Sequence, residues 1–252
     1  MSVTYEQTFT VDSRDVDLTG CARPSAILGY LQEAATMAAL RLGVSGPETL
    51  KKYNCFWMVV RIWVHLDRPL RWNERFTVRT WHRGAKGAST YRDFDLICDG
   101  VTVGEAVSTW VLADRDTYKL LRMSRLEEFQ GTDGGPLCKT RTLHRVRMPE
   151  VMTGREDRAL HYSDTDINGH VNNIKYADFA CDALHLEDKL SGRFIQELQI
   201  GYLDQCHAGE TITVETAAQD DVLYARGVGP GGAERFDCAL TLAPLPSEAE
   251  GT

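Results

Sequence analysis

Residues 163–173, SDTDINGHVNN, contain two carboxylates, three amides and one histidine within eleven positions. A histidine titrates near neutrality, so His170 can take a proton from a water molecule. Asp166 can hold the tautomer of that histidine, and Asn168 can donate a hydrogen bond to a water or a carbonyl oxygen. The same residue types commonly close turns and cap helices. The stretch is therefore either a well-made turn or an active site.

An internal repeat helps to separate these two interpretations. RDVDLTGCARPSAILGYLQEA aligns with SDTDINGHVNNIKYADFACDA, and later NERFTVRT aligns with GETITVET. In the first copy, Thr19 and Cys21 stand where the second copy has Asn168 and His170. The first copy is expected to make the same turn without the amide and the imidazole. We therefore expect Asn168 and His170 to serve chemistry.

The hydrophobic patterns place this turn between a strand and a helix in each copy. The elements predicted for the first copy are a strand at 3–11, a helix at 24–42 and strands at 55–67, 74–82, 88–98 and 101–114. Those predicted for the second copy are a strand at 156–162, a helix at 173–186 and strands at 193–206, 210–218, 221–228 and 234–243. The fold class is therefore α+β, with two tandem units in which a curved antiparallel sheet buries the apolar face of a central helix. We place the first unit at 1–130, a linker at 131–153 and the second unit at 154–252.

The composition is that of an ordinary globular protein, with 43% hydrophobic and 25% charged residues. A net charge of −8 argues against a general nucleic-acid binder. The sequence has no run of 18 apolar residues and no signal-like start, so no membrane segment or export is expected. The seven cysteines form no CxxC pair, which is typical of reduced thiols and favours a cytoplasmic protein.

Three segments, spread over the chain, resemble the acyl-acyl carrier protein thioesterase family. SDTDINGHVNNIKYADF is similar to the family run D-x-N-x-H-V-N-N-x-K-Y, and VSTWVLADRDTYKLLRMS to its segment W-V-L-x-D-x-x-T. LQIGYLDQCHAGE is similar to a later strand that ends Y-x-x-E-C. The resemblance implies a double hot-dog fold and, in the second unit, hydrolysis of fatty acyl-acyl carrier protein to a free fatty acid in fatty acid biosynthesis. It carries over as site residues Asp166, Asn168, His170 and Cys206, while the family glutamate falls on Gln205.

Two schemes for thioester cleavage remain open. In the favoured one, His170 activates a water, and Asn168 with backbone N–H groups around 171–173 binds the oxyanion. In the other, Cys206 is the nucleophile. The amide of Gln205 cannot act as a base. If the strand runs to 206, alternation places Asp204 on the face of Cys206, where it can supply the missing carboxylate.

Acyl carrier protein is the partner that the resemblance implies. The basic run 139–147, KTRTLHRVR, is either a solvated linker or a dock for such an acidic protein. Acyl-coenzyme A hydrolysis and non-catalytic acyl binding are the alternative functions. We expect no cofactor, no metal, no nucleic acid and no membrane partner, and a homodimer is left open. Small residues on the first helix, Ala34, Ala35 and Ala38, would leave room for an acyl chain.

Overall fold

The computed structural model describes residues 4–129 and 133–246. Its contacts divide the chain into two compact units. Unit 1 comprises Met1–Phe9, Leu28–Val64 and Arg75–His144, and unit 2 comprises Thr10–Ile27, His65–Glu74 and Arg145–Thr252. The domain boundaries expected at 130 and 153 follow the sequence repeat and stay predictions. None of the helices in the described ranges is long and apolar enough to cross a membrane.

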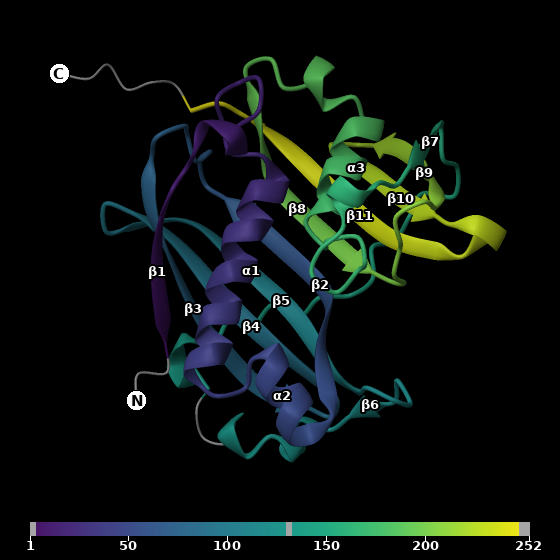
Figure 1. Cartoon of the computed structure of the whole chain (residues 1–252). Helices are drawn as coiled ribbons and strands as arrows, with labels where there is room; N and C mark the ends of the chain where they lie inside the picture. Colours follow the sequence, from purple (N-terminus) through teal and green to yellow (C-terminus); the bar gives the residue numbers. More distant parts are fainter. Residues whose placement is uncertain (1–3, 130–132, 247–252) are drawn as a thin grey trace. The chain divides into compact units, whose positions relative to one another are not determined.

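Unit 1 packs a helix against a sheet (Figure 1). Its strands are β1 (Tyr5–Thr10), β2 (Cys55–Leu66), β3 (Arg75–Lys86), β4 (Ser89–Cys98), β5 (Val101–Asp114) and β6 (Leu120–Leu121). They are hydrogen-bonded in the order β1-β3-β4-β5-β2, and β6 pairs with β5. Helix α1 (Pro24–Arg41) has proline at its first position, where no N–H partner is lost. Its Tyr30 ring lies 5.0 Å from Phe9 of β1 and 5.1 Å from Phe76 of β3, which anchors the helix to the sheet.

Unit 2 repeats this plan with a shorter helix. Its elements are β7 (Gly154–Ala159), α3 (Lys175–Ala183), β8 (Arg193–Tyr202), β9 (Thr211–Gln219), β10 (Val222–Val228) and β11 (Glu234–Pro244). The strands are hydrogen-bonded in the order β7-β9-β10-β11-β8. Tyr176 of α3 meets Phe236 of β11 at 5.3 Å, and Arg158 of β7 lies 4.2 Å above the Phe179 ring. Counted along each copy, both sheets have the strand order first-third-fourth-fifth-second, so the α+β repeat is confirmed.

One helix was not predicted, α2 (Gly46–Tyr53). It begins with a capping box in which Glu48 accepts the backbone N–H of Ser45 at 2.9 Å. It ends at Asn54, whose φ of 50° lies in the left-handed region that stops helices. The segment SGPE carries this signal in the sequence.

Three predicted elements end three or more residues too late: the strand at 156–162, which ends at Ala159, the helix at 173–186 and the strand at 193–206. Helix α3 begins at Lys175 because residues 172–174 form a tight turn, with Lys175 donating its N–H to Asn172 at 2.9 Å. It ends before His185, which is left-handed with a φ of 50°. Strand β8 ends at Tyr202, so residues 203–206 belong to a loop and not to the expected strand.

Candidate active site

The polar turn of the second copy repeats the backbone hydrogen bonds of the turn in the first copy. Asp166 donates its N–H to the carbonyl of His170 at 2.9 Å, and Asp17 donates to Cys21 at 2.8 Å. The glycine of each turn has a left-handed φ, which disfavours a side chain: 76° at Gly20 and 77° at Gly169. The first turn therefore forms without an amide or an imidazole at the positions of Asn168 and His170.

The aspartate of each turn is used in the same way. Asp166 accepts the backbone N–H of Asn168 at 2.8 Å, and Asp17 accepts that of Thr19 at 2.8 Å. Asp166 also accepts the Asn168 side-chain amide at 3.3 Å. Within the described ranges, no hydrogen bond joins the Asp166 carboxylate to the His170 ring. Asp166 therefore orients Asn168, whereas we had expected it to orient His170.

The amide and the imidazole that the first turn lacks are both accessible. Asn168 is exposed, and its amide keeps a second N–H beyond the one bonded to Asp166. His170 is half-buried, and its ring meets the ring of His207 edge to face, with the centroids 5.0 Å apart. The turn thus presents an amide donor and an imidazole base within two positions of each other.

The backbone donors expected at 171–173 are mostly taken. Val171 donates its N–H to the carbonyl of Cys206 at 2.8 Å, and Asn172 donates to Asp164 at 2.8 Å. In the part of the chain that the structure describes, the N–H of Asn173 has no such bond. One of these three N–H groups is therefore left as a donor, because Val171 bonds to the loop after β8 and Asn172 bonds within the turn.

The loop after β8 changes the expected role of Asp204. Its carboxylate pairs with Arg235 and accepts the N–H of Gln205 at 2.9 Å. Arg235 also donates to the Gln205 carbonyl at 3.0 Å. The alternation argument fails because residues 204–206 are not in a strand, and Asp204 is held by a cation. Gln205 is partly exposed beside it.

Cys206 is fully buried, with none of its surface exposed. Burial raises the pKa of its thiol, although a hydrogen bond with Tyr176 opposes the shift. This contact with Tyr176 was not predicted. The only signal for it in the sequence is that Tyr176 lies in the K-Y pair that ends the polar run. A raised pKa disfavours the thiolate, which is the nucleophilic form of cysteine.

Sequence models of known families match most of the chain. Residues 2–129 match the acyl-ACP thioesterase N-terminal domain, and residues 153–228 match the C-terminal domain of the same family. The chain belongs to the acyl-ACP thioesterase family. The family resemblance seen in the three sequence segments is confirmed.

Among curated relatives of this thioesterase family, the oleoyl-acyl carrier protein thioesterase 1 of Arabidopsis thaliana is 22% identical, over 99% of this chain and 73% of its own length. The palmitoyl-acyl carrier protein thioesterase of Gossypium hirsutum is 25% identical, over 86% of this chain and 55% of its own length. This chain thus spans between about half and three quarters of these two relatives.

Solved structures of thioesterases share the fold. An acyl-ACP thioesterase from Bacteroides thetaiotaomicron has a TM-score of 0.79 at 21% identity, covering 95% of this chain and 98% of its own. The 12:0-ACP thioesterase from Umbellularia californica has a TM-score of 0.81 at 18% identity, covering 97% and 98%. The expected double hot-dog fold is confirmed.

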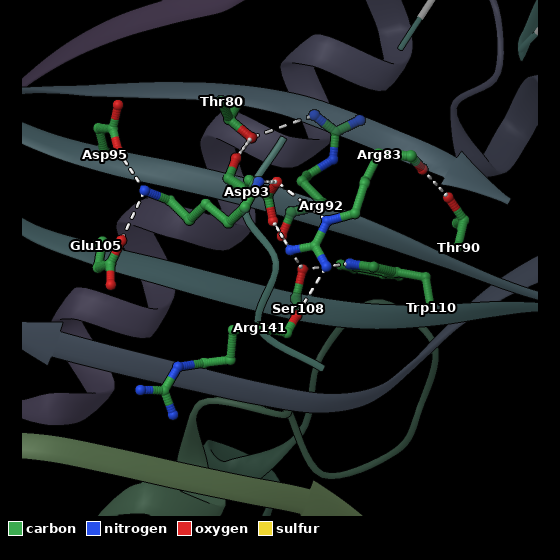
Figure 2. Close-up of polar contacts among 11 residues, drawn as sticks. Thr80, Arg83, Thr90, Arg92, Asp93, Asp95, Glu105, Ser108, Trp110 and Arg141 are labelled. Carbon is green, nitrogen blue, oxygen red and sulfur yellow. Dashed lines mark hydrogen bonds and ion pairs between the residues drawn. The ribbon is translucent and has the colours of Figure 1, made fainter. Parts of the chain in front are cut away.

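The basic run Lys139–Arg147 of this thioesterase is packed on unit 1 at its start (Figure 2). The Lys139 ammonium group donates to Asp95 at 2.8 Å and to Glu105 at 2.7 Å. Arg141 stacks 3.6 Å above the Trp63 ring, and Leu143 is buried. In unit 2, Arg145 pairs with Glu234 and Asp237. Three of the four Lys and Arg side chains of the run are therefore engaged within the chain, although most of its residues are exposed.

Proposed function

We propose that this chain hydrolyses the thioester of fatty acyl-acyl carrier protein, releasing a free fatty acid and the carrier-protein thiol. The observation that carries the proposal is the comparison of the two turns in a member of this family. Both have the same backbone, and only the second presents Asn168 and His170. Catalytic groups that are not needed for folding account for this difference.

His170 is the base in the proposed reaction. It takes a proton from a water molecule as the water oxygen attacks the thioester carbonyl carbon. The carbon–sulfur bond then breaks, and the proton passes from His170 to the leaving sulfur. Water and thioester become carboxylic acid and thiol, so no other reactant is needed.

Asn168 supplies a hydrogen bond to the carbonyl oxygen as its negative charge develops. Asp166 fixes the Asn168 backbone and its amide, so that the free N–H points in a defined direction. The N–H of Asn173, just before α3, has no backbone hydrogen bond within the described residues and is a further donor to this oxygen. These residue roles are proposals drawn from the geometry of the turn.

Direct attack by water is favoured over a Cys206 nucleophile. A thiolate at Cys206 would have to form in a fully buried position where burial raises the thiol pKa. The His170 ring contacts His207, and no hydrogen bond joins it to Cys206 in the described residues. His170 is therefore not placed as the base that would activate Cys206.

Acyl-coenzyme A hydrolysis is the second candidate, because the same turn can act on any thioester. The names of the relatives favour the carrier protein, since both curated relatives are acyl carrier protein thioesterases. The test measures kcat/KM for one acyl chain on carrier protein and on coenzyme A. We expect the carrier-protein thioester to be the better substrate, and His170→Ala to lower kcat by about two to four orders of magnitude.

Tight acyl binding without release of free acid would overturn this proposal in favour of a non-catalytic binder. If folded His170→Ala keeps near-full activity, His170 is not the catalytic base and the active site lies elsewhere in the chain. A cytoplasmic location, a role in fatty acid biosynthesis and assembly as a homodimer stay predictions. Each can be examined separately, by fractionation, by lipid analysis of a deletion strain and by light scattering.

A further inference from the structure

The ring of His170 has an unexpected neighbour. A catalytic histidine is usually held by a carboxylate, and three candidates for that role are engaged elsewhere or unsuitable. Asp166 binds Asn168, Asp204 pairs with Arg235, and Gln205 carries an amide. The ring contact that His170 does make is with His207, with an interplanar angle of 85° and centroids 5.0 Å apart.

The backbone brings these two histidines together in a defined way. In the first copy, Cys21 and Arg71 form an isolated antiparallel bridge, and Ala22 donates its N–H to Leu70 at 2.7 Å. The aligned bond of the second copy runs from Val171 to Cys206 at 2.8 Å. His170 and His207 therefore occupy the places of Cys21 and Arg71. Both members of this neighbouring pair are histidine only in the copy with the candidate site.

The His207 side chain points to the accessible side of its loop, as contact with the His170 ring requires. Cys206 is buried and His207 is exposed, so the two neighbours point to opposite sides of the loop. His207 lies on the accessible side, where Asn168 is also exposed. It therefore contacts the His170 ring without entering the core.

We propose that His207 is a positioning residue, which holds the His170 ring edge to face in the orientation that accepts a proton from water. Resting on the proposed function, this assigns to an aromatic contact the orienting task that no carboxylate among the described residues performs for His170. His207 itself neither gains nor loses the transferred proton. Edge-to-face ring pairs contribute enough to favour one ring orientation over others.

The experiment compares His207→Ala with His207→Phe in the full chain. The phenylalanine keeps an aromatic ring but carries no proton-transferring group. We expect His207→Ala to lower kcat by about two- to tenfold, the range of a ring pair, with KM and Tm unchanged. His207→Phe should restore kcat to near the wild-type value. Arg71→Ala, at the matching position of the first copy, should leave kcat unchanged.

A second measurement needs no substrate. The His170 ring protons should show an NMR ring-current shift that is lost in His207→Ala and kept in His207→Phe. Equal kcat in wild type and His207→Ala would overturn the inference, and so would a His207→Phe as slow as His207→Ala. If wild type releases no fatty acid, the proposed function fails by itself. The NMR comparison then decides whether His207 orients His170: an unchanged shift in His207→Ala refutes it.

Discussion

The carboxylate of Asp166 binds Asn168 twice, through the backbone N–H at 2.8 Å and the side-chain amide at 3.3 Å. In the first copy Asp17 binds Thr19 twice, through the backbone N–H at 2.8 Å and the hydroxyl at 2.6 Å. An aspartate thus closes the turn in both copies. Only in the second copy does the same aspartate also hold an amide that can act on a substrate.

This pairing predicts different effects for one substitution at two aligned sites. Asp166→Ala and Asp17→Ala should each lower the free energy of unfolding by about 1 kcal/mol, the usual loss for a cap-like hydrogen bond. Asp166→Ala should also lower kcat by about ten- to a hundredfold, because Asn168 is no longer oriented. Removing the Asn168 amide itself should lower kcat further. Urea unfolding and steady-state kinetics measure both effects. Equal loss of kcat in Asp17→Ala would contradict the division of roles.

Water attack predicts that the buried thiol is dispensable. Cys206→Ala and Cys206→Ser should keep most of the wild-type kcat, and no acyl-enzyme should accumulate. Mass spectrometry of the protein quenched during turnover detects an acyl group directly. Since Cys206 is buried against Tyr176, Tm is measured alongside to separate packing from chemistry. An acyl adduct on Cys206 would establish the nucleophilic scheme instead.

Restoring the family glutamate tests whether a carboxylate is useful at position 205. Gln205 is partly exposed, and its backbone is held by Asp204 and Arg235, so a carboxylate can be placed there without repacking. Gln205→Glu should hold or raise kcat, because a carboxylate at the family position can act as a base, which the amide cannot. Gln205→Ala is the control for loss of the side chain. A drop in kcat on Gln205→Glu at constant Tm would speak against this reasoning.

The small residues of α1 predict control of chain length. Ala34, Ala35 and Ala38 are at most 5% exposed. Each buried methylene of an acyl chain contributes about 0.8 kcal/mol, so a bulkier wall should exclude the longest chains steeply. Replacing each alanine with Leu should shorten the preferred acyl chain for at least one position. The measurement is kcat/KM across a series of chain lengths.

Overpacking at these alanines costs about 1–3 kcal/mol, so each variant is first checked for a cooperative unfolding transition. Activity on short chains serves as the internal control, because the proposed catalytic turn of Asn168 and His170 is left unchanged. If every folded variant keeps the parent profile, α1 does not line the acyl chain.

His185 predicts a pH-dependent contribution to stability. Its ring lies 3.3 Å from Glu187 and 2.7 Å from Glu156 of β7, and the Glu187 hydrogen bond, then the Glu156 charge, raises the pKa of His185. Because the folded pKa is the higher one, the stabilisation is fully present below the unfolded value of about 6.5 and is lost as the pH rises through the folded pKa.

Wild type should therefore exceed His185→Gln in free energy of unfolding at mildly acidic pH, and the two should converge at alkaline pH. Urea unfolding across this range measures the difference. In a background carrying Glu156→Gln and Glu187→Gln, the pH dependence of the difference should disappear. If the pH dependence persists in that background, groups other than Glu156 and Glu187 raise the pKa of His185.

The order of elements and the polar turn could be predicted because both copies carry the same local signals. Alternation and helical periodicity recur in the same order, and the aligned turns differ at the positions of Asn168 and His170. The missed helix α2 is short, and its signal is the single capping box from Ser45 to Glu48. A search for capping boxes would have found it.

Other features depend on contacts between distant residues, which no local pattern reports. Strand β8 ends early, and beyond its end Asp204 pairs with Arg235, thirty-one positions further along. Lys139 lies against the sheet because its ammonium group forms salt bridges with Asp95 of β4 and Glu105 of β5. The contact between the His170 and His207 rings likewise depends on two separate loops, joined by the hydrogen bond from the Val171 N–H to the Cys206 carbonyl.

The duplicated turn has an evolutionary consequence. Because the Asp, the Gly and the backbone bonds are shared by both turns, the loop requires neither an amide at position 168 nor an imidazole at position 170. Mutation at these two positions can change or abolish activity while the protein stays intact, so they can drift without penalty once selection for turnover is relaxed. The first copy uses the same two positions for structure: the Thr19 hydroxyl binds Asp17, and Cys21 is buried. The double substitution Thr19→Asn and Cys21→His therefore tests whether the first turn hydrolyses a thioester once it carries the residues of the second turn.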